Sequence, residues 1–208
     1  MLATLLGSKS RAAILARLVV APGHRSHLRE LVRAAGGSVS SVQREVGRLV
    51  DMGLVRTWLD EGGRRQVELV AEHPFAEALS GLIAADPRAQ YGARSSVIPN
   101  LDPQVGEMLG GMVDAIVTSF DPIEIVLFGS QARGLADADS DIDLLVVMPI
   151  PSDDRETSVA LRSVIGVVGR GVDVIATDAA GIELARTRLA SVVRDALDEG
   201  VTVYERSA

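Results

Sequence analysis

Four aspartates lie in a short stretch between two apolar runs, LFGSQARGLADADSDIDLLVV at residues 127–147. The last two, Asp141 and Asp143, open an apolar run that predicts a strand over residues 141–148. Side chains two positions apart on a strand leave the same face, so we expect these carboxylates to lie close together. Like charges at that separation repel each other, and holding both ionised requires a cation. Ligation by oxygen alone is typical of Mg²⁺ or Mn²⁺, which complete their coordination with water and phosphate oxygens.

The other aspartates nearby are of two kinds. Asp173 interrupts the apolar run GVDVIATD at residues 171–178, which predicts a further strand. A charged group between valines is costly unless it has a partner, and on a neighbouring strand it would join the first two carboxylates at one spot. Asp137 and Asp139 are instead expected to belong to a solvated loop, in which Ser140 shapes the turn.

A phosphate-binding turn is expected beside these carboxylates. Gly129 and Ser130 lie where a predicted strand at 123–129 ends and a short helix begins, so backbone N–H groups there face outward. Gly129 lets the main chain approach a phosphate closely, and Ser130 adds a hydroxyl donor. Arg133, one turn further on, is expected to reach a phosphate oxygen. The pattern as a whole predicts a site for a nucleoside triphosphate and its metal ions.

The elements that must position these residues predict an α/β domain with a small mixed sheet. Apolar runs of strand length alternate with longer runs that have helical periodicity. The predicted strands are 123–129, 141–148, 171–178 and 201–205, and the predicted helices are 103–120, 154–169 and 180–200.

This arrangement resembles the signature of the DNA polymerase beta-type nucleotidyltransferase superfamily. Its marks are Gly-Ser, then Asp-x-Asp, then a later aspartate on another strand. The form GSQARG…SDIDLLV is most similar to the minimal nucleotidyltransferases, which include antitoxins paired with HEPN-type partners. The resemblance covers residues 103–206.

The resemblance also implies a role for each site residue. Gly129 and Ser130 would bind the triphosphate, and Asp141 and Asp143 would hold two metal ions. Asp173 would share one metal and help to deprotonate the attacking hydroxyl. The implied reaction uses Mg²⁺ or Mn²⁺, takes ATP as donor, transfers AMP and expels pyrophosphate.

The first part of the chain predicts a different, mainly helical module. Helical periodicity over residues 8–20, 26–37 and 38–53 is followed by two β-rich runs, 54–59 and 64–70, joined by Asp-Glu-Gly-Gly. Three helices followed by a hairpin is the order of a winged helix-turn-helix domain. The stretch SVSSVQREVGRLVDMGLVRTW…GGRRQVEL resembles the winged-helix domains of ArsR- and MarR-like regulators.

This resemblance implies that the third helix lies in the major groove of double-stranded DNA while the hairpin touches phosphates or the minor groove. The inward face of that helix is predicted to contain Val39, Val42, Val46, Leu49 and Val50. The predicted DNA-contacting residues are polar or basic positions on its outer face and at the tip of the hairpin: Ser38, Ser40, Ser41, Gln43, Arg44, Arg48, Arg64 and Arg65.

Composition supports two modules with different partners. Residues 1–100 carry 13 basic and 9 acidic side chains, whereas residues 101–208 carry 8 and 19. We predict a winged-helix domain at 1–84, a linker at 85–102 and a nucleotidyltransferase domain at 103–208, because three prolines and several small polar residues occur over residues 84–103. There is no cysteine, so disulfides and thiolate metal sites are excluded. No signal peptide or membrane span is expected, and the predicted location is cytoplasmic.

The expected function is therefore a DNA-binding transcription regulator fused to a nucleotidyltransferase. The short catalytic module leaves no room for an acceptor-binding domain, so a partner protein, another subunit or a ligand bound across an interface is expected to supply the acceptor. The resemblance to antitoxins implies that the acceptor hydroxyl lies on a partner protein such as a HEPN-like toxin. A homodimer is expected because winged-helix regulators usually read near-palindromic sites. Two alternatives remain: a regulator that senses nucleotide without turnover, and a transferase that acts on RNA or a small molecule.

Overall fold

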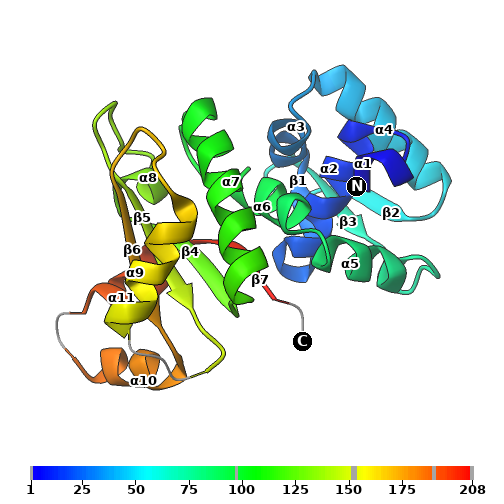
Figure 1. The fold of residues 1–208 in the computed structure, drawn as a ribbon. Helices are drawn as coiled ribbons and strands as arrows, with labels where there is room; N and C mark the ends of the chain where they lie inside the picture. Colours follow the sequence, from blue (N-terminus) through cyan, green and yellow to red (C-terminus); the bar gives the residue numbers. More distant parts are fainter. Residues whose placement is uncertain (1, 97, 151–153, 189–190, 207–208) are drawn as a thin grey trace. The chain divides into compact units, whose positions relative to one another are not determined.

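The computed structural model describes residues 2–96, 98–150, 154–188 and 191–206. The chain divides into two compact units, Met1–Val97 and Ile98–Ala208 (Figure 1). The first is mainly helical with a small sheet, and the second has a four-stranded sheet flanked by helices. The predicted fold class is confirmed for both units.

Two of the helices in the first unit begin where a serine hydroxyl accepts from a backbone N–H group. Ser8 accepts a hydrogen bond from the Arg11 backbone N–H (3.2 Å) and so caps the helix that begins at Lys9. The first helices are α1 (Leu2–Leu5), α2 (Lys9–Val20), α3 (Leu28–Ala35) and α4 (Val39–Asp51), with a 3₁₀ turn at Pro22–His24. The second of the three predicted helices begins later than expected, because residues 25–27 form a strand instead.

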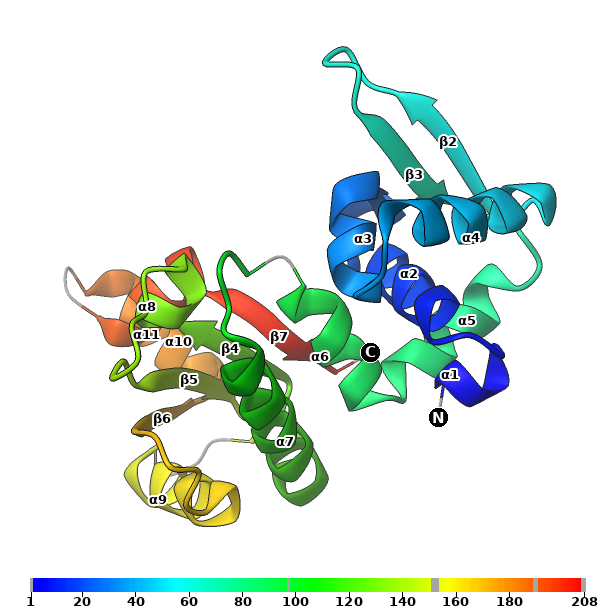
Figure 2. The same ribbon diagram turned by 90° about the horizontal axis from the view of Figure 1, so that it is seen from above.

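The sheet of the first unit consists of that short strand and a two-stranded hairpin, the wing. The strands are β1 (Arg25–His27), β2 (Val55–Leu59) and β3 (Arg65–Leu69), all antiparallel in the order β1-β3-β2. The β2–β3 hairpin projects away from the helices of its unit (Figure 2). At its turn, one Asp60 oxygen accepts from the Gly62 and Arg64 backbone N–H groups, at 3.0 and 2.9 Å. Helix order and wing define a winged-helix fold.

The core of the first unit joins α2, α3, α4 and the wing, but not every predicted inward residue belongs to it. Val42, Val46 and Leu49 of α4 are buried as expected. Val39 and Val50 are 54% and 40% exposed, so their predicted inward orientation is wrong. Both lie at the margins of the apolar stripe, where α4 turns toward solvent.

The predicted linker is largely a helix of the first unit. After α5 (Ala76–Ala84), helix α6 (Pro87–Ser95) packs against α2 and buries Tyr91. This burial raises the pKa of Tyr91 to about 12. Asp86 caps this helix by accepting from the Ala89 backbone N–H (3.1 Å). Asp-Pro pairs are helix starts here, because proline at the first helical position loses no hydrogen bond. The prediction of a linker over 85–102 is wrong for this segment.

The second unit is built on a mixed sheet with strand order β6-β5-β4-β7. Only β5 and β6 run parallel; the other neighbours are antiparallel. Helices α7 and α9 cover one face, and α11 packs on the other, where Ala196 meets Val126 and Leu145 (Figures 1 and 2). The elements are α7 (Pro103–Phe120), β4 (Glu124–Phe128), α8 (Gly129–Arg133), β5 (Ile142–Val147), α9 (Asp154–Ile165), β6 (Val172–Thr177), α10 (Ala179–Thr187), α11 (Val192–Glu199) and β7 (Val201–Glu205).

Two predicted helices are shorter than their apolar patterns suggest. The expected helix 180–200 divides into α10 and α11: Arg188 has extended backbone and Ser191 caps α11 by accepting from the Arg194 N–H (3.5 Å). The expected helix 154–169 ends at Ile165, because Gly166 adopts a positive φ of 71°. No helix among the described residues is long and apolar enough to cross a membrane.

A buried carboxylate fixes α4 to α2. Glu45 is 9% exposed, and its carboxylate accepts from Arg11 Nε (3.1 Å) on α2 and from Arg48 Nη1 (2.5 Å) in its own helix. We predict that Glu45→Ala lowers the free energy of unfolding by about 2 kcal/mol, because both guanidinium groups lose a charged acceptor. Urea denaturation measures this. Glu61→Ala, at an exposed position in the wing turn, is the matched control and should change stability by less than about 0.5 kcal/mol. Equal effects would contradict the role of Glu45.

Candidate functional site

The structure brings the three predicted carboxylates to one end of two adjacent strands. β5 and β6 pair in parallel with Asp143 directly beside Asp173. Asp141 immediately precedes β5, two positions from Asp143, so its side chain is expected on the same face. On the other side of β5, Phe128 at the end of β4 pairs with Asp143, so the Gly129-Ser130 turn follows directly beside this carboxylate.

Two glycines make room for two of the carboxylates. Gly129 has a positive φ of 70°, and a Cβ there would overlap Asp143 Oδ2. A Cβ at Gly171, just before β6, would overlap Asp141 Oδ1. The sequence analysis assigned Gly129 to close phosphate approach and did not identify Gly171. No local signal marks Gly171, because its role depends on a residue thirty positions away.

The local electrostatics are those of crowded acids. The pKa of Asp143 is raised, first by burial and then by the negative charges of Asp173 and Asp141. The positive charge of Arg133 acts in the opposite direction. A cation bound between these carboxylates would therefore relieve both the desolvation and the repulsion.

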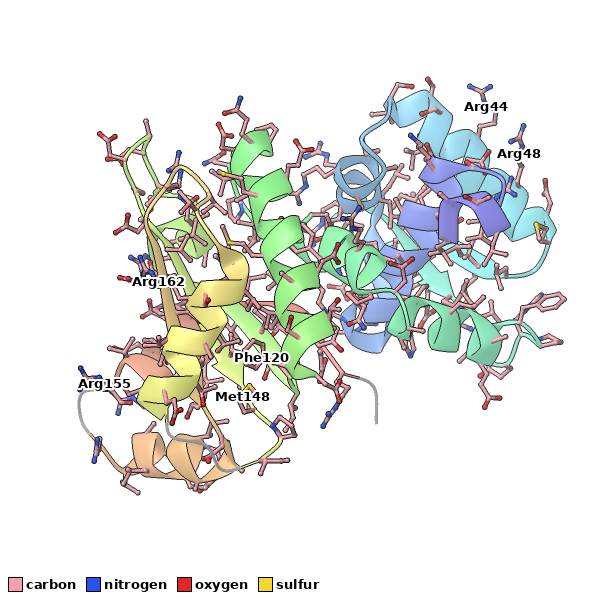
Figure 3. All side chains as sticks on the ribbon, in the orientation of Figure 1. Arg44, Arg48, Phe120, Met148, Arg155 and Arg162 are labelled. Carbon is pink, nitrogen blue, oxygen red and sulfur yellow. The ribbon has the colours of Figure 1, made fainter. Side chains whose placement is uncertain are left out.

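Two arginines place positive charge near these carboxylates. Arg162 of α9 donates from Nη1 to Asp173 Oδ1 at 3.3 Å, and Figure 3 places its side chain on α9. Arg133, predicted to contact phosphate, lies 3.5 Å from Glu199 of α11 through Nη1. Both pairs are exposed, so each is weak and can be exchanged for a ligand. Sequence reasoning missed Arg162, whose spacing from Asp173 carries no recognisable pattern.

The intervening loop is ordered by its own polar groups. Asp137 Oδ1 accepts from Ser140 Oγ (2.7 Å) and from the Asp139 backbone N–H (3.1 Å), and the Ser140 hydroxyl is the main reason that the pKa of Asp137 is lowered. Arg170 Nη1 donates to the Ser140 carbonyl (2.8 Å). Ser140 thus shapes the turn as expected, whereas Asp137 has a structural role beyond solvation.

The donor set fits a hard divalent cation, since it consists of carboxylate oxygens and like charges that need neutralising. Within the described ranges, no three acidic, histidine or cysteine side chains already converge as a metal cluster. Asp173 is turned to Arg162 in this arrangement. Asp141, Asp143 and Asp173 are the residues that would hold Mg²⁺ or Mn²⁺.

The predicted DNA-contacting residues divide into bound and free groups. Ser38 caps α4 by accepting from the Ser41 N–H (3.2 Å), and Ser41 Oγ donates to the Ser38 carbonyl (2.8 Å), so these hydroxyls position the helix start. Gln43 and Arg44 are exposed on the outer face. Ser40 is also exposed, but its Oγ lies 3.1 Å from Ser38 Oγ, and Arg48 donates to Glu45. Figure 3 shows Arg44 and Arg48 extending from α4.

The wing contributes two of the predicted arginines. Arg64 Nε is paired with Asp60 Oδ2 at 3.1 Å, whereas Arg65 is exposed. Arg65 and Gln43 line one cavity of about 230 Å³ between α4 and the hairpin. The structure thus brings residues of the third helix and of the wing together.

Helix α3 adds two arginines that the sequence analysis did not identify. Arg29 and Arg33 line a cavity of about 420 Å³ together with Arg64 and Arg65 of the wing. Their spacing of four residues places them on one helix face, which is the signal that sequence reasoning overlooked. The basic surface of this unit therefore extends from the wing onto α3.

Comparison with protein families identifies the class of the second unit. Residues 112–203 match the family model described as nucleotidyltransferase domain. The second unit therefore contains a nucleotidyltransferase domain, as the resemblance predicted. A search of curated proteins found no match.

Solved structures similar to the chain are MarR-family regulators. AbsC from Streptomyces coelicolor is 23% identical with a TM-score of 0.35, and the match covers 55% of this chain and 74% of that one. A regulator from Silicibacter pomeroyi is 20% identical with a TM-score of 0.35, over 56% and 76%. A second Streptomyces coelicolor regulator, in complex with DNA, is 21% identical with a TM-score of 0.34, over 55% and 70%. The winged-helix assignment rests on the element order of the unit itself.

The glycine at the phosphate turn yields a direct test. We predict that Gly129→Ala lowers the free energy of unfolding by about 1–3 kcal/mol, through a positive φ and overlap with Asp143. Gly111→Ala in α7 is the matched control, because its Cβ would meet no atom within 4 Å. It should be neutral or stabilising by up to about 1 kcal/mol. Urea denaturation distinguishes the two, and a neutral Gly129→Ala would contradict the packing described.

Proposed function

We propose that the chain is a DNA-binding transcription regulator fused to a metal-dependent nucleotidyltransferase that transfers AMP from ATP to an acceptor hydroxyl. The observation that carries the catalytic part is the side-by-side placement of Asp143 and Asp173 next to the Gly129 turn. Two acidic strand positions beside a glycine-opened turn suit a nucleotide triphosphate and its cations.

The residues of the chain would act mainly by positioning and by charge. Gly129 allows the main chain to approach the triphosphate, and Ser130 donates a hydrogen bond to it. Arg133 exchanges Glu199 for a phosphate oxygen. Asp141, Asp143 and Asp173 would hold Mg²⁺ or Mn²⁺, which supplies Lewis-acid stabilisation of the developing phosphate charge.

Asp173 has the second task of taking the acceptor proton. Once Arg162 leaves it, its carboxylate accepts the proton of the attacking hydroxyl. The oxygen then attacks the α-phosphorus in line, the bond to the β-phosphate breaks, and pyrophosphate leaves. The raised pKa of Asp143 means that acidification protonates it before an ordinary aspartate and weakens cation binding.

The proposed acceptor belongs to a partner protein. A hydroxyl from a HEPN-like toxin in a toxin–antitoxin pair is the acceptor that the sequence resemblance favours. The regulator would act as a homodimer on a near-palindromic DNA site.

We predict that the purified chain, with Mg²⁺ and a co-expressed HEPN-like protein, transfers label from [α-³²P]ATP but not from [γ-³²P]ATP. Asp143→Asn should reduce labelling by about 100-fold or more, because a cation ligand is lost. Asp139→Asn is the matched control in the same stretch, since its side chain lies exposed in the loop. Gel autoradiography and release of pyrophosphate measure the transfer.

Each other outcome selects an alternative. ATP binding by calorimetry without any transfer would reject the transferase and support a nucleotide-sensing regulator. Label on added RNA rather than on protein would support the RNA-directed transferase. Equal labelling by the wild type and Asp143→Asn would contradict the proposed role of the carboxylates in catalysis.

For the DNA-binding part, we predict that Arg44→Ala and Arg29→Ala each weaken binding to all duplexes and reduce the slope of log affinity against log salt by about 1. Gln43→Ala should instead relax base preference, by about 1–3 kcal/mol at one position. Fluorescence anisotropy with a duplex selected from a random pool measures both. Arg155→Ala, on α9 of the other unit, is the control, and an equal loss there would indicate unspecific charge attraction.

A further inference from the structure

The first unit contains a polar cavity to which the proposed function assigns no role. It measures about 480 Å³, within the range of small-molecule sites. It lies between the start of α3, the end of α2 and the turn of the wing, with the adjoining ends of β2 and β3. Its lining includes Arg17, Arg25, Glu30, Trp58, Asp60 and Arg64.

The two carboxylates of the cavity already have donors. Glu30 accepts from Ser26 Oγ and, at 3.5 Å, from Arg17 Nη2. Asp60 accepts from two backbone N–H groups, from Arg64 Nε (3.1 Å) and from Gln66 Nε2 (2.9 Å). These two carboxylates therefore can accept few further hydrogen bonds from the other arginine N–H groups of the cavity.

Arg17 is the buried cation of the cavity. It is 8% exposed, and its Nε has no hydrogen-bond partner in the described part of the chain. Burial lowers its pKa, Glu30 opposes this, and Arg94 and Arg33 add further positive charge nearby. A buried guanidinium with an unsatisfied donor is costly unless an anion completes its surroundings.

Two more features of the lining indicate the kind of anion. Arg25 is exposed and forms no ion pair among the described residues, so it is free to bind a ligand. The Trp58 indole is 37% exposed and gives the cavity an aromatic wall. Several arginines suit a phosphate, which carries more charge than a carboxylate and accepts bidentate hydrogen bonds. A planar ring can stack on an indole.

We propose that this cavity binds a nucleoside phosphate, with its phosphate on Arg17 and Arg25 and its base against Trp58. The ligand would link nucleotide level to DNA binding. Arg64 lines both this cavity and the basic cavity of about 420 Å³ that faces α3. A phosphate that draws Arg64 away from Asp60 changes the turn of the wing. The proposal does not depend on nucleotidyl transfer, because every residue in it belongs to the first unit.

Trp58 makes the test direct, because it is the only tryptophan in the 208 residues. AMP is titrated into the full chain carrying Asp143→Asn, which separates this site from the proposed transferase site, and indole fluorescence is followed. Saturable quenching by AMP is expected, with adenosine and inorganic phosphate each at least about tenfold weaker, since each lacks one of the two contacts.

Variants assign the quenching to the cavity. Arg25→Ala, at an exposed position, should weaken AMP about tenfold or more without loss of folding. Arg17→Met should do the same, with circular dichroism as a check of its fold. Arg56→Ala is the charge-matched control, because Arg56 lies on β2, pairs with Glu68 at 2.6 Å and is not part of the cavity lining. It should leave AMP affinity unchanged.

Three results would overturn the proposal. The first is the absence of saturable quenching by AMP. The second is quenching that survives Arg25→Ala or falls equally in Arg56→Ala. The third is inorganic phosphate binding as tightly as AMP, which would exclude stacking on Trp58. None of these results bears on the labelling experiment, so the two proposals fail separately.

Discussion

Mutual repulsion between carboxylates is the constraint around which the second unit is organised. Asp143 and Asp173 occupy paired positions on parallel strands, and neither strand can slide to separate them. Ile142 and Leu144, on either side of Asp143, are fully buried and hold the register of β5. The stability of the sheet thus maintains an electrostatic strain that only a proton or a cation at the site can relieve.

The surroundings of these acids limit that strain without removing it. Gly129 and Gly171 leave space for the carboxylates of Asp143 and Asp141, so the crowding is electrostatic and not steric. Arg162 and Arg133 supply positive charge from helices, on side chains exposed enough to leave. A site for a charged substrate requires this combination of rigidly held carboxylates and arginine side chains that can change partners.

Much of this organisation could be predicted from sequence, because strand periodicity places Asp143 and Asp173 on strands and Asp141 next to the first of them. Features that depend on residues distant in sequence could not. Gly171 matters only because Asp141 folds over it, and the cavity around Arg17 requires α2, β1 and the wing to meet. The wrong linker prediction had a local cause: prolines are typical of linkers, but Asp86-Pro87 starts helix α6.

The position of β7 has a consequence for biosynthesis. This strand is the last in the sequence, yet it pairs with β4, the first strand of the sheet, and forms the edge of the order β6-β5-β4-β7. On the ribosome, β4 therefore remains an open edge until residues 201–205 have emerged. The winged-helix unit meets no such delay, since its own strands and core lie within the first part of the chain. The nascent chain should thus complete its winged-helix unit before its four-stranded sheet.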